Sequence, residues 1–170
     1  VMKCARNWGL IDHNPCNKIG RLREKPRERY VSDMDWSIAY PLGSETVQIA
    51  MDLADITGLR RANILGLKRS DWGPDGLMVQ LVKQRQNSAT KRVLFTRTPE
   101  LEAVINRALK LRPVASMFLI CKKDGKPYTD HGFSSLWQRF MKKVVDAGVE
   151  RFTFHDLRGR SASDAESDEE

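Results

Sequence analysis

The pattern of apolar positions along the chain predicts three long helices, at residues 44–57, 98–112 and 129–148. Within each range apolar residues recur at spacings of three and four, which is the pattern of a helix with one buried face. Ser44 and Thr98 stand at the N-cap positions of the first two. Two shorter helices are predicted at 32–42, with Ser32 as N-cap, and at 59–66.

One region alternates in the way that β-strands do. Leu77, Val79 and Leu81 alternate with their neighbours, and a second apolar run at 93–95 follows a polar turn. This pattern predicts an antiparallel hairpin or a three-stranded meander. A further apolar run at 118–121, before Asp124-Gly125, predicts a short strand and a turn. We therefore expect an α+β fold, mostly α-helical with a small antiparallel β-sheet.

Composition and charge narrow the functional classes. With 41% hydrophobic and 30% charged residues the chain is typical of a soluble globular protein, and no apolar run is long enough to span a bilayer. Its three cysteines lie far apart in the sequence, which argues against a zinc site or disulfide framework and favours a reducing cytosol. The net charge is +7 although acidic residues crowd the C-terminal end, so the body is strongly basic and nucleic acid is a favoured partner.

Two arginines follow a glycine turn in an unusual position. Arg60 and Arg61 come directly after Thr57-Gly58, at the start of a predicted helix, where a cation opposes the helix dipole. An oxyanion ligand would explain them, and so would an ion pair between Arg60 and Asp55. The sequence leaves both interpretations open.

Two further groups carry possible phosphate chemistry. His155 and Arg158 are three residues apart at the start of a predicted helix, which suits a phosphate cradle, or else a capping histidine and a surface arginine. Lys83 and Lys91 flank the hairpin turn, where a lysine either reaches a phosphate or is simply exposed to solvent.

Taken in order, these motifs resemble the catalytic domain of the tyrosine recombinases, the phage integrase family. The resemblance is carried by TGLRRANILGLKRSDW at 57–72, by the hairpin that follows, and by HDLR at 155–158. WGLIDHNPC and PRERYVS resemble the family's passage from its core-binding domain into its catalytic domain. The resemblance implies that residues 1–29 are the end of a core-binding domain and a basic linker, and that residues 30–170 are a catalytic domain truncated at its C-terminus.

The resemblance also implies a reaction, namely site-specific DNA recombination or integration by an enzyme that breaks and rejoins DNA strands. Arg60, His155 and Arg158 would bind and activate the scissile phosphate, and a tyrosine would attack phosphorus. The general acid toward the leaving 5′ hydroxyl would be Lys83, with Arg85 and Lys91 as open alternatives. The residues expected to contact DNA phosphates are Arg60, Arg61, Lys91 and Arg158.

The chain departs from the family pattern in two places. Asn63 stands where the family usually has an acidic residue that braces the site. All three tyrosines, Tyr30, Tyr40 and Tyr128, precede HDLR, so none occupies the place of the nucleophile. We therefore expect these 170 residues to be inactive by themselves.

The expected partner is double-stranded DNA, with self-association on DNA in the full-length protein and a monomeric state for this chain alone. We expect no metal, no cofactor and no membrane. A phage or prophage protein of this kind, encoded by a mobile element, would act on DNA in the bacterial cytoplasm. Two alternatives stay open: a non-catalytic DNA-binding module on the same scaffold, and DNA relaxation of the type IB topoisomerase kind.

Overall fold

The computed structural model describes residues 2–13, 29–81, 91–111 and 116–167, and the side chains of all of these except 2, 3 and 162–167. The end of the WGLIDHNPC motif from residue 14 on, the basic linker up to residue 28, Lys83 and Arg85 lie outside the described residues. The helices are α1 (Met2–Asn7), α2 (Asp33–Ala39), α3 (Glu45–Thr57), α4 (Arg61–Leu65), α5 (Pro99–Lys110), α6 (Asp130–Asp146) and α7 (Asp156–Ser167). Short 3₁₀ turns follow α2 and α4, at Tyr40–Leu42 and Arg69–Asp71.

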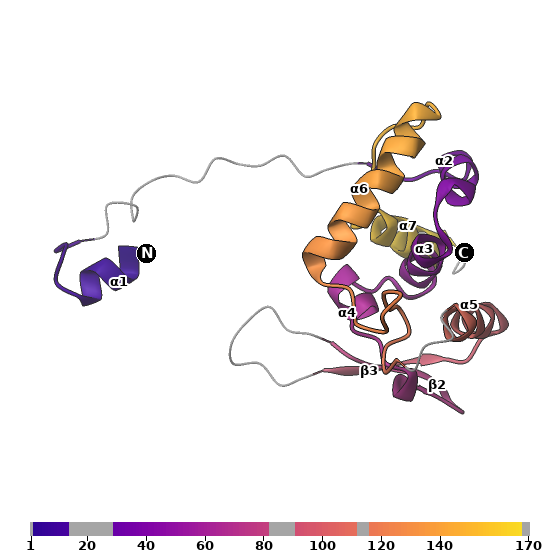
Figure 1. Ribbon diagram of the computed structural model, residues 1–170, viewed down its shortest axis with the longest axis horizontal. Helices are drawn as coiled ribbons and strands as arrows, with labels where there is room; N and C mark the ends of the chain where they lie inside the picture. The colour runs from indigo at the N-terminus through magenta and orange to yellow at the C-terminus, as the bar shows by residue number, and fades with distance from the viewer. Residues whose placement is uncertain (1, 14–28, 82–90, 112–115, 168–170) are drawn as a thin grey trace.

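The sheet is a three-stranded antiparallel meander, as the alternating pattern predicts. Strands β1 (Trp72–Gly73), β2 (Gly76–Gln80) and β3 (Arg92–Thr96) pair in the order β1-β2-β3. Leu77 and Val79 are buried on one face, whereas the cross-strand partners Met78 and Leu94 are exposed on the other. The α+β fold, mostly helical with a small antiparallel sheet, is confirmed (Figure 1).

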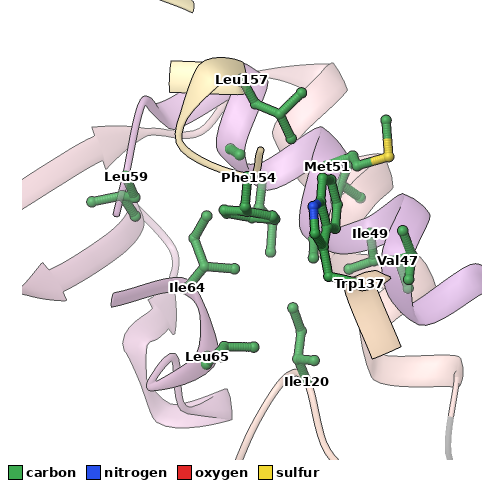
Figure 2. Packing of buried hydrophobic residues seen from close by; sticks show 14 of the residues in the cluster. Val47, Ile49, Met51, Leu59, Ile64, Leu65, Ile120, Trp137, Phe154 and Leu157 are labelled. Carbon is green, nitrogen blue, oxygen red and sulfur yellow. The ribbon is translucent and has the colours of Figure 1, made fainter. Parts of the chain in front are cut away.

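Helix α3 runs through the centre of the core. It packs against α5 and α7 and contacts α4 and α6. Figure 2 shows its residues Val47, Ile49 and Met51 in the same buried cluster as Trp137 of α6. Because seven of its residues are buried, α3 is the element on which the others are assembled.

The predicted helix starts agree closely with the structure. Ser32 and Thr98 accept hydrogen bonds from the amides of Asp35 and Leu101, at 3.1 and 3.3 Å, as N-caps do. Ser44 occupies the N-cap position of α3, but its side chain makes no capping hydrogen bond. Helix α3 ends at Gly58, which adopts the left-handed conformation with φ 59°.

The strand predicted at 118–121 is wrong. Leu119, Ile120 and Cys121 are buried as an apolar run predicts. The run nevertheless makes only isolated bridges at its two ends, Phe118 with Lys68 and Cys121 with Pro127. The segment crosses the loop after α4, where the Leu119 amide donates to the Leu67 carbonyl at 2.9 Å, and it never joins the sheet. The turn after it is confirmed, with Gly125 at φ 78°.

The N-terminal part has two different environments. Helix α1 lies apart from the rest in Figure 1, and Trp8 and Leu10 just beyond it are exposed. Val31 and Ala39, by contrast, are fully buried in the core.

None of the described helices has the length and apolar character needed to cross a membrane.

Candidate active site

Arg60 is placed by the turn between α3 and α4. Leu59 before it is buried in the core, whereas Arg60 is the exposed N-cap residue of α4. Its guanidinium has no hydrogen-bond or ion-pair partner among the residues that the structure describes. The alternative pairing with Asp55 is not observed, because Asp55 instead accepts a hydrogen bond from Arg160 at 3.1 Å.

Gly58 allows α7 to pass close to this turn. A Cβ at Gly58 would lie 3.3 Å from Ser161 Oγ on α7, and its φ of 59° is unfavourable for other residues. The glycine therefore serves both the turn and the close packing of α7 beside α3.

His155 is placed by two buried phenylalanines. Phe152 and Phe154 alternate with exposed or half-buried Thr153 and His155, so the aromatic rings point into the core and the polar side chains away from it. The Phe154 ring packs edge-on against Phe133 and Trp137 of α6, at centroid distances of 5.6 and 5.1 Å. Figure 2 shows Phe154 and Leu157 entering the same core as Leu59. The segment that carries Arg60 and the segment that carries His155 and Arg158 are therefore anchored in one core.

Asp156 fixes the turn that carries His155. Its carboxylate accepts a hydrogen bond from the Thr153 amide at 2.7 Å, and its own amide donates to the Thr153 carbonyl at 3.1 Å. Helix α7 therefore begins at Asp156 and not at Thr153. His155 lies in the turn just before the helix and Arg158 in its first turn, on the side of the candidate site.

A pocket of about 540 Å³ brings the predicted residues together. Arg60, Arg61, His155 and Arg158 all line it, although the sequence separates the two motifs widely. Arg60 and Arg158 also line a smaller neighbouring pocket of about 180 Å³, together with Asn63, Leu81 just after β2 and Val93 of β3. The two arginines thus lie where the main pocket meets the sheet.

The pocket also contains a carboxylate that sequence reasoning missed. Asp130, the first residue of α6, pairs with Arg61 at 2.5 Å, and Arg61 also donates to Ser134 Oγ at 3.2 Å. Only the fold brings α4 beside the start of α6, so no local signal identified Asp130. Arg61 is therefore already bound to an acid, whereas Arg60 and Arg158 pair with no acid among the described residues.

The remaining predicted residues lie elsewhere. Lys91 is exposed just before β3, where its carbonyl accepts from the Leu81 amide at 2.9 Å, and it does not line the main pocket. Lys83, the first choice for general acid, falls outside the described residues. Asn63 is buried, at 5% exposure, at the edge of the smaller pocket.

None of the three tyrosines lines the main pocket. The Tyr40 hydroxyl donates to Asp52 at 2.8 Å and accepts from Arg107 at 3.0 Å. Burial raises the pKa of Tyr40, so the phenol stays protonated in this network.

Within the part of the chain that the structure describes, no cluster of His, Cys, Asp and Glu suits a metal ion.

The fold is shared with solved DNA recombinases. A lambda integrase tetramer bound to a Holliday junction matches with a TM-score of 0.70 and 18% identity, over 95% of this chain and 49% of that one. The Tn1549 transposon integrase in complex with circular intermediate DNA matches with a TM-score of 0.66 and 17% identity, over 98% of this chain and 62% of that one. XerA recombinase matches with a TM-score of 0.65 and 17% identity, over 92% of this chain and 56% of that one. The chain thus spans less than two thirds of the length of each of these proteins.

These matches define the architecture as that of a tyrosine recombinase catalytic domain. No curated protein sequence matches the chain. The sequence model of the phage integrase family matches residues 38–165, which is most of the chain, and the chain belongs to that family.

Proposed function

We propose that this domain binds duplex DNA and serves site-specific strand breaking and rejoining, with Arg60, His155 and Arg158 around the scissile phosphate. The observation that carries the proposal is the single pocket lined by all three side chains. None of them has a side-chain partner among the described residues, whereas Arg29, Arg97, Arg107 and Arg160 are each paired with a carboxylate. A pocket with uncommitted guanidinium groups suits a phosphate diester.

In the proposed reaction the two arginines hold the non-bridging oxygens of the phosphate. They stabilise the negative charge that grows there when the oxygen of a tyrosine, which gives up its proton to solvent, attacks phosphorus. The phosphorus–O5′ bond breaks as the phosphotyrosyl bond forms, and the leaving 5′ oxygen takes a proton from the hairpin lysine, for which we propose Lys83. His155 supports the phosphate by a hydrogen bond, and rejoining reverses these steps without ATP because the bond energy is conserved.

We infer that the nucleophile is none of Tyr30, Tyr40 and Tyr128. Tyr40 is held by Asp52 and Arg107, and the other two stay outside the pocket. We therefore expect these 170 residues to form no covalent adduct when mixed with a suicide duplex that traps phosphotyrosyl intermediates. A DNA-linked band on a denaturing gel would contradict this.

The partners follow from the same proposal. Lambda integrase forms a tetramer on a Holliday junction and a dimer on a core site, and we propose that the full-length form of this protein likewise self-associates on its DNA. The net charge of +7 supports duplex binding.

The proposal is tested by DNA binding of matched arginine variants. Arg60→Met and Arg158→Met should each weaken binding of a labelled 20-bp duplex at least about tenfold, because each removes one charge-assisted phosphate contact. Arg107→Met is the control, since it also removes an arginine but breaks the network with Asp52, which lies on α3 and does not line the pocket. Equal losses in all three variants would show that charge alone decides binding and would overturn the pocket as the phosphate site.

A further inference from the structure

The segment that carries His155 and Arg158 is held at both ends by one short stretch of chain. This stretch, the lead-in segment, consists of residues 29–36 and passes from Arg29 into α2. It contacts Glu150, just before the FTFHDLR sequence, and Arg160, just after it. We call these contacts together the clasp.

The Arg160 arm of the clasp is largely buried. The Arg160 side chain is 13% exposed; its Nε donates to Asp55 on α3 at 3.1 Å and one Nη donates to the Val31 carbonyl at 3.3 Å. The guanidinium also stacks on the Trp36 ring, 5.1 Å from its centroid. An ion pair with Asp33 at 2.7 Å adds little, since Asp33 is 92% exposed.

The Arg29 arm joins the other end. Arg29 donates to Asp35 at 2.9 Å and to the Glu150 carbonyl at 3.3 Å, while its Nε lies 3.4 Å from the Glu150 carboxylate. The side chains of Arg29 and Asp35 are only 18% and 20% exposed, so this arm is partly protected from water. Both ends of residues 150–160 are therefore attached to the lead-in segment.

The contacts of Arg160 oppose rotation of α7 about its own axis. Successive residues of a helix are about 100° apart, so Arg158 and Arg160 point to nearly opposite sides of α7. Arg158 lines the pocket, and Arg160 contacts α3 and the lead-in segment. A rotation or shift of α7 that moved Arg158 away from the pocket would have to break the buried Arg160 contacts.

We propose that the clasp positions Arg158 and His155 for phosphate binding, and that it couples their position to the lead-in segment. Arg160 is a positioning residue that acts through Arg158 and touches no substrate. The inference rests on the proposed function for the phosphate site. It adds that movement of the lead-in segment changes phosphate affinity at a pocket to which this segment contributes no lining residue.

A double-mutant cycle tests the clasp. Arg160→Met should weaken binding of the labelled 20-bp duplex by about three- to tenfold, but by less than about twofold in an Arg158→Met background, because the two residues act through one interaction. Equal losses in both backgrounds would overturn the inference, since Arg160 would then act on DNA or on the fold independently of Arg158.

Two controls separate positioning from stability. Arg107→Met breaks a comparable ion pair to α3, from α5 rather than α7, and should lower the melting temperature without changing the coupling to Arg158. Arg29→Met removes the other arm of the clasp and should show the same dependence on Arg158. It takes the place of Arg160→Met in the test if Arg160→Met folds poorly. If Arg107→Met weakens DNA binding as much as Arg160→Met, global stability explains the effect and the clasp has no positioning role.

A spectroscopic readout keeps the inference independent of the proposed function. The imidazole NMR signals of His155, assigned by His155→Gln, should shift in Arg160→Met and Arg29→Met and stay unchanged in Arg107→Met. If Arg158→Met leaves DNA affinity unchanged, the proposed phosphate site fails, yet the His155 signals still report on the clasp. Unchanged signals in both clasp variants would overturn the clasp alone.

Discussion

At the residue scale, the site depends on apolar neighbours of its polar groups. Leu59 precedes Arg60, and Leu157 precedes Arg158; both leucines are buried in the core that Figure 2 shows. The backbone of each arginine is thereby held one residue from a buried anchor. The cost of placing the backbone of the two arginines is met when the core folds, so that only their side chains remain to be ordered when a phosphate binds.

Gly58 gives the clearest prediction for a single residue. Gly58→Ala should lower the free energy of unfolding by about 1–3 kcal/mol, because alanine is strained at φ 59° and its methyl group would crowd Ser161. Chemical denaturation measures the change. Gly148→Ala is the matched control, since Gly148 also has a positive φ, of 86°, but nothing lies within 4 Å of its missing Cβ. Equal losses in both variants would show that contact with Ser161 contributes nothing.

At the element scale, the sequence predicted most elements because their signals are local. Caps, the Gly58 stop and the alternation of Leu77 and Val79 act within a few residues, and the observed boundaries follow them. The run at 118–121 misled us because burial alone does not distinguish a strand from an apolar loop that crosses the core. Whether a run pairs depends on its neighbours in space.

The pairing of charged side chains was not predictable in the same way. Asp55 pairs with Arg160 and not with nearby Arg60, and Asp130 pairs with Arg61 across a long stretch of sequence. These choices follow from how α7 and α6 pack, which no local pattern specifies. The pocket residues that a motif names were predictable, whereas the residues that hold them in place were not.

Helix α2 carries a prediction about pH. Burial alone would raise the pKa of Asp35, but hydrogen bonds from Arg29 and Ser32 outweigh it and hold the pKa below its usual range. The carboxylate therefore stabilises the fold above the ordinary pKa of an aspartate, and this contribution is lost as the pH falls through the lowered pKa. Asp35→Asn should be less stable at neutral pH and should lose less stability on acidification. Thermal melts between pH 3 and 7 measure the difference, and parallel curves would contradict it.

At the scale of the whole molecule, the basic body and the pocket contribute to DNA binding in different ways. The net charge of +7 attracts any duplex by releasing counterions, whereas the pocket offers two uncommitted arginines at one place. Removing the pocket arginines should therefore weaken binding without abolishing it. The two contributions can be separated by salt.

The salt dependence of the Arg60→Met/Arg158→Met double variant tests this division. If each arginine contacts one phosphate, the slope of log K against log salt should fall in magnitude by about 1.8, because each phosphate contact contributes about 0.9. The ratio of the unchanged chain's affinity to that of the double variant should therefore grow as the salt concentration is lowered, because the counterions released by the two lost contacts favour binding most at low salt. A matched double variant, Arg139→Met/Lys142→Met, removes two exposed cations of α6 that do not line the main pocket. Because these side chains have no cradle to fix a phosphate, their loss should change the slope less, and an equal change would mean that DNA binds the whole basic face without using the pocket.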